Sequence, residues 1–324
     1  MKIKISELDK LVLDVLLTRY TTKKANFIKE VLMFGELSGK PSHGLLRLLP
    51  KTYGVFTDSI AGDPEFIKKT KVSTVIDGRG NVGMLVGSLA MQEVIRLAKE
   101  TGIGIVGTRN SVNSTGSLSY YCEKIANENL IGIIFTKSVP VIAPFASKKA
   151  LFGTNPIAFG IPSMPHPFIF DMSTSAITFG SIMNHKLRGK QLPQDVAIDN
   201  EGNMTTDPEK VRATLAFDNS YKGSGLAMMV ELLAAVWTGA SFAGQNEKDG
   251  QGNLYLALSP ELLSGTEMLK ERSRELIETI RNVETRDGKK TRIPGENTFQ
   301  IRDNNLSRGE IEVDDVLLEK IQKV

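Results

Sequence analysis

The segment SHGLLR, residues 42–47, holds the residue types of an acid–base site for a substrate that carries a carboxylate. His43 is one of 3 histidines, and an imidazole exchanges a proton near neutral pH. Arg47 follows four residues later, and a guanidinium binds a carboxylate through two parallel hydrogen bonds. If a helix has begun here, both side chains share one face. By spacing alone, a histidine at a helix start beside a surface arginine is the more common interpretation.

A second candidate is the glycine spacing Gly78-x-Gly80-x-x-Gly83, which lies between an apolar run and a helical pattern. This is the spacing of a dinucleotide-binding turn, whose backbone amides bind a pyrophosphate. The next strand should then end in an acidic residue, but here it ends at Thr108-Arg109. An arginine there suits only a 2′-phosphate. The motif is a weak signal, and a strand-to-helix turn with glycines at positive φ explains it more simply.

Other segments also carry residues that suit an anionic ligand. FIFDMSTS, residues 168–175, is a strand that ends in an acid and a run of hydroxyls, which favours a helix cap or phosphate contacts. YKGSG, residues 221–225, places a lysine at a helix start, where the positive end of the dipole attracts anions. PGE, residues 294–296, forms a tight turn. A long Pro/Gly/Ser-rich excursion within 133–162 joins two strands, and such loops usually have a function.

The length, composition and net charge are those of an ordinary soluble protein, and they argue against several functional classes. The 324 residues correspond by size to two domains or to one large domain with excursions. A net charge of +3 is too balanced to indicate nucleic acid or an anionic membrane. Cys122 is the only cysteine and no HExxH motif occurs, so we expect neither a disulfide nor a metal. No segment reaches about 18 uncharged apolar residues, and the first residues lack the unbroken apolar core and cleavage site expected of a signal peptide. We therefore expect a cytoplasmic protein with no membrane partner.

The elements that must position these residues follow from periodicity. The first 60 residues form a helical block, with helices from Ser6, over 22–37 and over 45–56. Short β-branched or apolar runs predict strands at 72–76, 103–106, 131–136, 157–161, 168–170 and 254–258. Helices are expected at about 84–100, 117–128, 222–238, 260–282 and 313–324. The stretch 184–220 is polar and irregular, with a turn at 199–203.

Several remaining residues receive the ordinary structural interpretation. His166 and His185 are expected on surface loops, and Asp195 and Asp199 are expected to be loop acids. Trp237 and the pair at 228–229, both methionines, are more typical of a core than of a binding site.

Taken together, the segments resemble the type-2 malate/L-lactate dehydrogenase family, which includes ureidoglycolate, sulfolactate and diketogulonate dehydrogenases and a cyclic imino-acid reductase. The motifs that carry the resemblance are SHGLLR, NSTGSLSYY, FGTNPIAFGIP, FIFDMSTSA, DNEGNMTTDP, YKGSGLAMMVELLAA and IPGE. They occur in order through most of the chain, so they specify the family and leave the substrate open.

The resemblance implies an α+β fold that is not a Rossmann fold. In such a fold a mixed, largely antiparallel sheet wrapped by helices binds the cofactor, and the glycine spacing at 78–83 is then unrelated to it. Two units are expected. Residues 1–70 with 297–324 form a helical domain that carries the His/Arg motif, and residues 71–296 form the cofactor-binding domain.

The resemblance also assigns site residues and partners. His43 and Arg47 would meet a small carboxylate substrate. The cofactor would be NAD or NADP, with NAD favoured, although Arg109 and the lysine pair at 148–149 leave NADP open. Its contacts would be Ser138, Asp171, Met172, Ser173, Thr174, Lys222, Gly223, Gly295 and Glu296. A homodimer with the site near the subunit interface is expected.

One departure from the family concerns a second histidine, which many members carry where this chain has Ser114. A serine can hydrogen-bond a substrate but does not titrate near neutral pH. We therefore assign the proton transfer to His43 and a substrate contact to Ser114. The expected reaction is reversible hydride transfer between the nicotinamide and a 2-hydroxy/2-oxo acid of the malate, lactate or ureidoglycolate type. Reduction of a cyclic imino acid, nucleotide binding with impaired catalysis and, more weakly, a scaffold remain alternatives.

Overall fold

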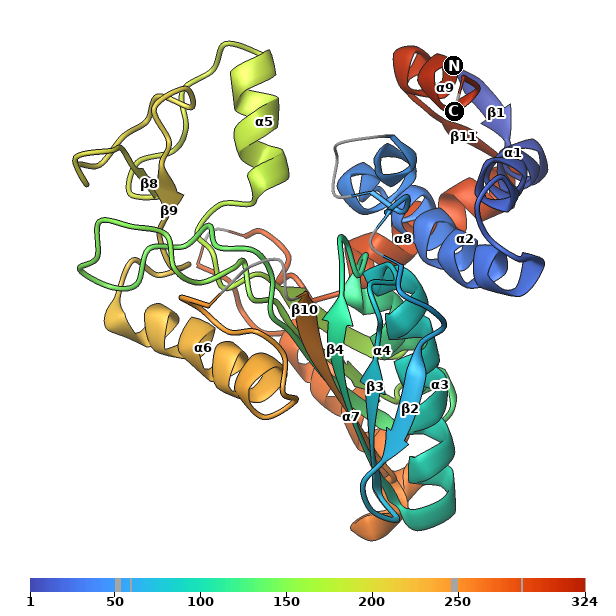
Figure 1. The fold of residues 1–324 in the computed structure, drawn as a ribbon. Coiled ribbons are helices and arrows are strands. Elements are labelled where there is room, and N and C mark those ends of the chain that lie inside the picture. Colours follow the sequence, from blue (N-terminus) through green and yellow to red (C-terminus); the bar gives the residue numbers. More distant parts are fainter. Residues whose placement is uncertain (50–53, 59, 246–249, 287, 324) are drawn as a thin grey trace.

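The computed structural model describes residues 1–49, 54–58, 60–245, 250–286 and 288–323, and it is built on a seven-stranded sheet with the order β2-β3-β4-β10-β5-β6-β7. Figure 1 shows this sheet with helices around it. The strands have the following bounds: β2 (Glu65–Lys68), β3 (Ser73–Asp77), β4 (Ile103–Ser111), β5 (Ile131–Thr136), β6 (Ile157–Ile161), β7 (Phe168–Met172) and β10 (Gln251–Leu258).

The sheet is mixed and largely antiparallel. Only β3 and β4 pair in parallel, and β10 pairs antiparallel with both β4 and β5 although it comes much later in the sequence. Burial alternates along β5, which is typical of a strand with one face packed on the core. The fold class expected from the resemblance is therefore confirmed.

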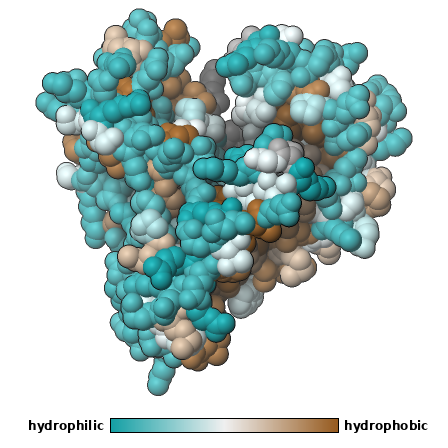
Figure 2. Space-filling model, turned by 180° about the vertical axis from the view of Figure 1, so that it is seen from behind, coloured by the Kyte–Doolittle hydropathy of each residue, from teal (hydrophilic) through white to brown (hydrophobic). Residues whose placement is uncertain are grey.

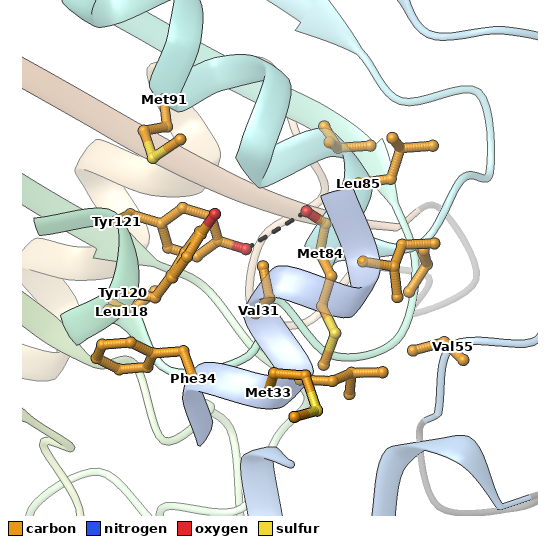
Figure 3. Close-up of a cluster of buried hydrophobic side chains, with 14 of the residues drawn as sticks. Val31, Met33, Phe34, Val55, Met84, Leu85, Met91, Leu118, Tyr120 and Tyr121 are labelled. Atoms are coloured by element: carbon orange, nitrogen blue, oxygen red, sulfur yellow. Dashed lines mark hydrogen bonds between the residues drawn. The ribbon is translucent and has the colours of Figure 1, made fainter. Parts of the chain in front are cut away.

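Helices α3 (Gly83–Thr101) and α4 (Leu118–Asn127) pack against the sheet, and α2 (Thr22–Leu37) packs against both of them. Their buried side chains form one core, in which Val31, Met84 and Tyr121 meet (Figure 3). The Tyr121 hydroxyl donates to the Met84 carbonyl at 3.4 Å and to the Thr115 carbonyl at 2.7 Å. These bonds tie the start of α3 to the loop that precedes α4.

The two ends of the chain lie side by side (Figure 1), because β1 (Lys2–Lys4) pairs antiparallel with β11 (Glu310–Glu312). With α1 (Ile5–Leu17), α2, α8 (Glu296–Arg308) and α9 (Asp315–Ile321) they form what we call the helical lobe. Its buried residues belong to the same hydrophobic cluster as the sheet. The boundary between two domains therefore stays a prediction.

A second lobe contains α5 (Phe179–Leu187), β8 (Ala197–Ile198) and β9 (Ala213–Thr214). The expected irregular stretch at 184–220 thus overlaps the end of a helix and includes a short strand pair. Figure 2 shows the two lobes standing apart, with a notch between them above the sheet. They approach each other at the start of α5, where a Cβ added to Gly180 would lie 3.5 Å from the Cβ of Ser42.

The glycine turn at 78–83 uses its amides within the protein. The amides of Gly78 and Gly80 donate to the carbonyls of Arg109 and Asn110, at 2.7 and 2.8 Å, and the amide of Gly83 donates to the Val112 carbonyl at 2.8 Å. Three donors that would bind a pyrophosphate are therefore already satisfied. The turn joins β3 to α3 and holds the end of β4.

Several helices differ from their expected bounds, each for a local reason. The expected helix at 45–56 is wrong: Leu45–Leu48 is one short 3-10 turn, and Leu49 is extended because Pro50 follows it. Residues 50–53 of that prediction lie outside the described residues. α6 (Tyr221–Glu231) continues as a π-helical turn, η3 (Leu232–Val236). The last helix, α9, begins later than expected, after β11.

The expected helix at 260–282 is divided. A 3-10 turn, η5 (Pro260–Leu262), precedes α7 (Thr266–Arg281), and Gly265 between them has φ +83, a conformation that other residues rarely adopt. Several elements were not predicted: the edge strand β2, the strand pairs β1–β11 and β8–β9, and the helices α5 and α8.

The expected burial at 228–229 and 237 is wrong, because α6 and η3 bury only one side. Met228, Met229 and Trp237 are 51%, 47% and 60% exposed. His185 lies on α5 rather than in a loop, and its Nδ1 lies 2.8 Å from the Ser181 carbonyl oxygen. Asp199 is a loop acid as expected, and its carboxylate accepts from the amides at 201 and 203.

Within the described part of the chain, no helix has the length and apolar character needed to cross a lipid bilayer.

A buried ion pair between α8 and α4 gives a test of this packing. Arg302 donates two hydrogen bonds to Glu123, at 2.7 and 2.8 Å, and the two side chains are 14% and 15% exposed. Because Arg302→Met leaves a largely buried carboxylate unpaired, it should lower the free energy of unfolding by about 3 kcal/mol, measured by urea titration. Lys2→Met is the control, since the exposed Lys2–Glu310 pair should contribute under about 1 kcal/mol. Equal losses in the two variants would contradict the assignment.

Candidate active site

His43 and Arg47 lie on two successive 3-10 turns, η1 (Pro41–His43) and η2 (Leu45–Leu48). Gly44 separates them with φ −104 and ψ −134, so the shared face of one helix is replaced by a kink. Arg47 folds back across the kink, and its Nε donates to the Ser42 carbonyl at 2.7 Å. The two side chains therefore stay neighbours, and the charge of Arg47 acts on His43.

The end of α2 supports this kink from below. The carboxylate of Glu36, which is 7% exposed, accepts a hydrogen bond from the Leu45 amide at 2.9 Å. A Cβ added to Gly35 would lie 2.6 Å from the His43 carbonyl oxygen, closer than real side chains approach. The backbone of the His43 turn thus rests directly on α2, and burial raises the pKa of Glu36.

The imidazole of His43 is neutral at neutral pH. Burial, the charge of Arg47 and the charge of Lys40 lower the pKa of His43 to about 4, while the charge of Asp171 acts in the opposite direction. The Nδ1 atom is buried and has no hydrogen-bond partner among the described residues. A buried ring nitrogen without a partner is suited to accept a proton or hydrogen bond from a ligand.

Asp171, at the end of β7, places its carboxylate at the N-terminus of α4. Its Oδ2 accepts from the Ser119 amide at 3.0 Å, from the Ser119 hydroxyl at 2.7 Å and from the Ser117 hydroxyl at 3.3 Å. The Lys40 ammonium lies 3.6 Å away. The sequence predicted Asp171 as a cofactor contact, and the structure places its carboxylate among Lys40 and the α4 serines, with its charge acting on His43.

Ser114 lies in the loop between β4 and α4. Its hydroxyl accepts from the Gly116 amide at 3.0 Å, and a Cβ added to Gly83 would lie 3.0 Å from its carbonyl oxygen. The glycine turn described above therefore supports the loop that carries Ser114. Among the described residues, Ser114 and His43 are not joined by a hydrogen bond.

Three of the predicted cofactor residues converge on one threonine, Thr154. The hydroxyls of Ser138 and Thr154 are 3.0 Å apart. The Ser173 and Thr174 hydroxyls both donate to the Thr154 carbonyl at 3.0 Å. Met172 is the last residue of β7 and pairs with Ile157 of β6 beside this cluster.

Lys222 and Gly223 open α6, which is joined to that cluster through the Phe217 amide, 2.9 Å from the Thr174 carbonyl. The Gly223 amide already donates to Asp218 at 3.1 Å, so a carboxylate of the protein occupies this helix start. Lys222 is exposed. The Lys222 side chain, rather than the backbone amides at the start of α6, is therefore available to a ligand.

Gly295 lies against β7, because a Cβ added there would be 2.8 Å from the Ile169 carbonyl oxygen. Glu296 points elsewhere, and its carboxylate accepts from Arg281 Nε at 3.0 Å. Both Glu296 and Arg281 line a cavity of about 350 Å³. His166 also lines it, stacked on Phe299 with ring centroids 4.6 Å apart and 45% exposed, as expected of a surface residue.

The side chains beside β5 fit an anionic cofactor that needs hydrogen bonds. The Thr136 hydroxyl is buried and has no partner among the described residues. Lys137, which follows it, is 4% exposed and forms no ion pair within the described chain. A buried hydroxyl without a partner is costly unless a ligand pairs with it, and Lys137 adds a positive charge beside it. Ser138 is the next residue, so these groups adjoin the predicted cofactor cluster.

Sequence reasoning missed four of these residues: Glu36, Lys40, Thr154 and Lys137. Lys40 was open to detection, because it precedes the His43 motif by only three positions. Thr154 lies inside the FGTNP motif that carried the resemblance. Glu36 and Lys137 gave no signal, since their importance comes from burial that a single sequence does not show.

Comparisons with known proteins identify the family of this chain. The family model for malate/L-lactate dehydrogenase matches residues 3–322. L-sulfolactate dehydrogenase from Methanocaldococcus jannaschii is 32% identical over 97% of this chain and 94% of its own length. Its solved structure superposes with a TM-score of 0.88 over 100% of this chain and 96% of that one. The chain belongs to the malate/L-lactate dehydrogenase family, and the resemblance noted in the sequence is confirmed.

Two further relatives differ in their named substrates. A Delta(1)-pyrroline-2-carboxylate/Delta(1)-piperideine-2-carboxylate reductase from Pseudomonas putida is 32% identical over 82% of this chain and 80% of its own length. Ureidoglycolate dehydrogenase (NAD(+)) from Escherichia coli is 28% identical over 79% of this chain and 75% of its own length.

The contact between Glu36 and the His43 turn can be tested by pH. Because burial raises the pKa of Glu36, ionising it costs folding free energy, and that cost appears as the pH rises above the ordinary value of 4.5. Glu36→Gln keeps an acceptor oxygen but does not ionise. Its stability relative to wild type, measured by chemical denaturation, should therefore increase between about pH 4 and pH 7. Glu319→Gln, at an exposed position, is the control. If the stability of both variants relative to wild type changes with pH in the same way, the interpretation is wrong.

Proposed function

We propose that this protein is an NAD(P)-dependent 2-hydroxy acid dehydrogenase, which transfers a hydride reversibly between a nicotinamide and a small 2-hydroxy/2-oxo acid. The observation that carries the proposal is the Nδ1 atom of His43, which is buried and has no hydrogen-bond partner among the described residues. The charges of Arg47 and Asp171 both act on this imidazole. This arrangement combines a proton acceptor with a carboxylate-binding cation. Family membership supports the reaction class.

The chain's own residues account for binding and proton transfer. Arg47 binds the substrate carboxylate and fixes the face of the reacting carbon. In oxidation, neutral His43 accepts the hydroxyl proton while the carbonyl forms, and in reduction the imidazolium returns that proton to the oxygen. Asp171 stabilises the imidazolium. The bound nicotinamide supplies or accepts the hydride. Ser114 would contact the substrate from the loop before α4.

We propose the Thr154 cluster as the core of the cofactor site. Ser138, Ser173 and Thr174 surround it, and Lys137 and Lys222 provide positive charge for the phosphates. Met172, Gly223, Gly295 and Glu296 complete the proposed contacts. NAD is favoured over NADP, because Arg109 is paired with Asp77 at 3.1 Å and one relative is named for NAD(+). A cytoplasmic location, expected from the sequence, belongs to the same proposal.

The direct test is oxidation of NADH and NADPH by the purified protein with oxaloacetate, pyruvate, 2-oxoglutarate, oxalurate and a cyclic imino acid. We expect turnover with a 2-oxo acid, and His43→Ala should reduce kcat by about 10²–10⁴-fold while NADH still binds. Arg47→Gln should raise KM for the acid. His166→Ala is the matched histidine control and should retain activity.

Each other outcome of this panel has a defined meaning. Turnover with the cyclic imino acid alone would assign the reductase reaction named for the Pseudomonas putida relative. NADH binding without turnover on any acid would indicate a nucleotide-binding protein, in which Ser114 does not replace the second histidine. Equal activity of His43→Ala and wild type would refute the role of His43.

We also propose a homodimer formed through α6. The side chains of α6 and η3 leave an apolar row between 41% and 66% exposed: Tyr221, Met228, Met229, Leu232, Val236 and Trp237. A contiguous apolar row of this kind is typical of a subunit interface.

This interface can be tested by light scattering, which should report a dimer for the wild type. The combined substitutions Leu232→Glu and Val236→Glu place charges in the interface and should give a monomer. Trp237 is the only tryptophan, so its emission should shift to longer wavelength in that variant. A monomeric wild type, or a double variant that remains dimeric, would contradict the proposal.

A further inference from the structure

A lysine occupies the candidate site without a role in the reaction described above. Lys40 immediately precedes η1, and its ammonium donates to the Ser119 hydroxyl at 2.9 Å and to the Ser117 hydroxyl at 3.2 Å. It lies 3.6 Å from Asp171 Oδ2 and is 28% exposed. The ammonium thus closes a ring of contacts between the His43 turn, the end of β7 and the N-terminus of α4.

The groups around His43 come from four elements. Arg47 faces it from η2, Lys40 from the residues before η1, and Asp171 from β7. Glu36 of α2 lies beneath the turn, bonded to the Leu45 amide. Of these, Arg47 and Lys40 carry positive charges that disfavour a protonated imidazole, and Asp171 favours it.

We propose that Lys40 is a positioning residue of the active site that holds Asp171 against α4 and, through its charge, opposes protonation of the His43 imidazole. The inference rests on the proposed role of His43. Lys40 does not touch the reacting atoms in this assignment. It acts through Asp171, by offsetting part of the carboxylate charge that His43 would otherwise experience.

The arrangement of the two cations gives Lys40 a role distinct from that of Arg47. A substrate carboxylate cancels the charge of Arg47 when it binds, so this contribution to the neutral imidazole is lost in the complex. Lys40 is already paired inside the protein, and its contribution stays when substrate is bound. In the loaded site, Lys40 and Asp171 therefore remain as opposing charges that act on His43 in addition to burial.

The test measures the protonation of His43 directly in the free protein, by NMR titration of the imidazole ring. Lys40→Met and Lys40→Gln both remove the charge, and the glutamine retains hydrogen bonds to the serines if the methionine variant fails to fold. Both should raise the midpoint of the His43 titration, and Asp171→Asn should lower it. Lys40→Arg keeps the charge and should leave the midpoint near that of wild type. Lys23→Met, at an exposed position on α2, is the control.

Where the protein turns over a 2-hydroxy acid, the acid limb of kcat/KM for its oxidation should move with the NMR midpoint. An unchanged midpoint in both neutral variants would overturn the inference. A midpoint that moves equally in Lys40→Arg would also overturn it, because that result would show a purely structural role. The NMR result does not depend on turnover, so an inactive protein with the expected shifts would refute the proposed reaction and leave this inference standing.

Discussion

The site depends on where one carboxylate is held. Asp171 leaves the end of β7 and lies on the first turn of α4, where the Ser119 amide and two serine hydroxyls satisfy its Oδ2 atom. An anion is stable at this position because the amides of a helix start lack partners within the helix. The contact fixes a sheet edge to a helix, and Lys40 extends it to the turn that carries His43. The acid–base chemistry therefore uses a contact that also joins the parts of the fold.

The glycine turn at 78–83 shows why spacing alone does not define a phosphate site. Three glycines let the chain leave β3 closely beside β4, and their amides then bond to carbonyls of that neighbouring strand. A pyrophosphate needs the same donors, so the two uses exclude each other. Gly83 packs closely against Ser114 and Thr115 and so supports the loop that carries them. The motif serves the site by packing and leaves nucleotide binding to other residues.

The sequence predicts most strands, because alternating or continuous runs of β-branched residues have few other stable arrangements. It predicts the fold class only through the family resemblance, since the insertion of β10 between β4 and β5 joins segments far apart in the chain. It fails at 45–56, where Pro50 acts on the residue before it, and at 228–237, where exposure depends on what packs against α6. Lys40 adjoins the His43 motif in the sequence, but its role depends on contacts with residues 77 and 79 positions away, which no local pattern records.

Burying a catalytic imidazole creates a conflict that the charges around His43 resolve. A dry site favours hydride transfer, but burial also opposes the imidazolium, and Arg47, needed for the substrate, opposes it further. In the proposed reaction, a carboxylate substrate would remove the second obstacle by offsetting the charge of Arg47, so protonation of His43 would become easier when an acid is bound. An aldehyde or ketone without a carboxylate would leave that charge uncompensated and His43 harder to protonate. Selectivity for acids would then arise from the proton affinity of His43 as well as from the hydrogen bonds of Arg47, with Asp171 supplying the charge that favours the imidazolium.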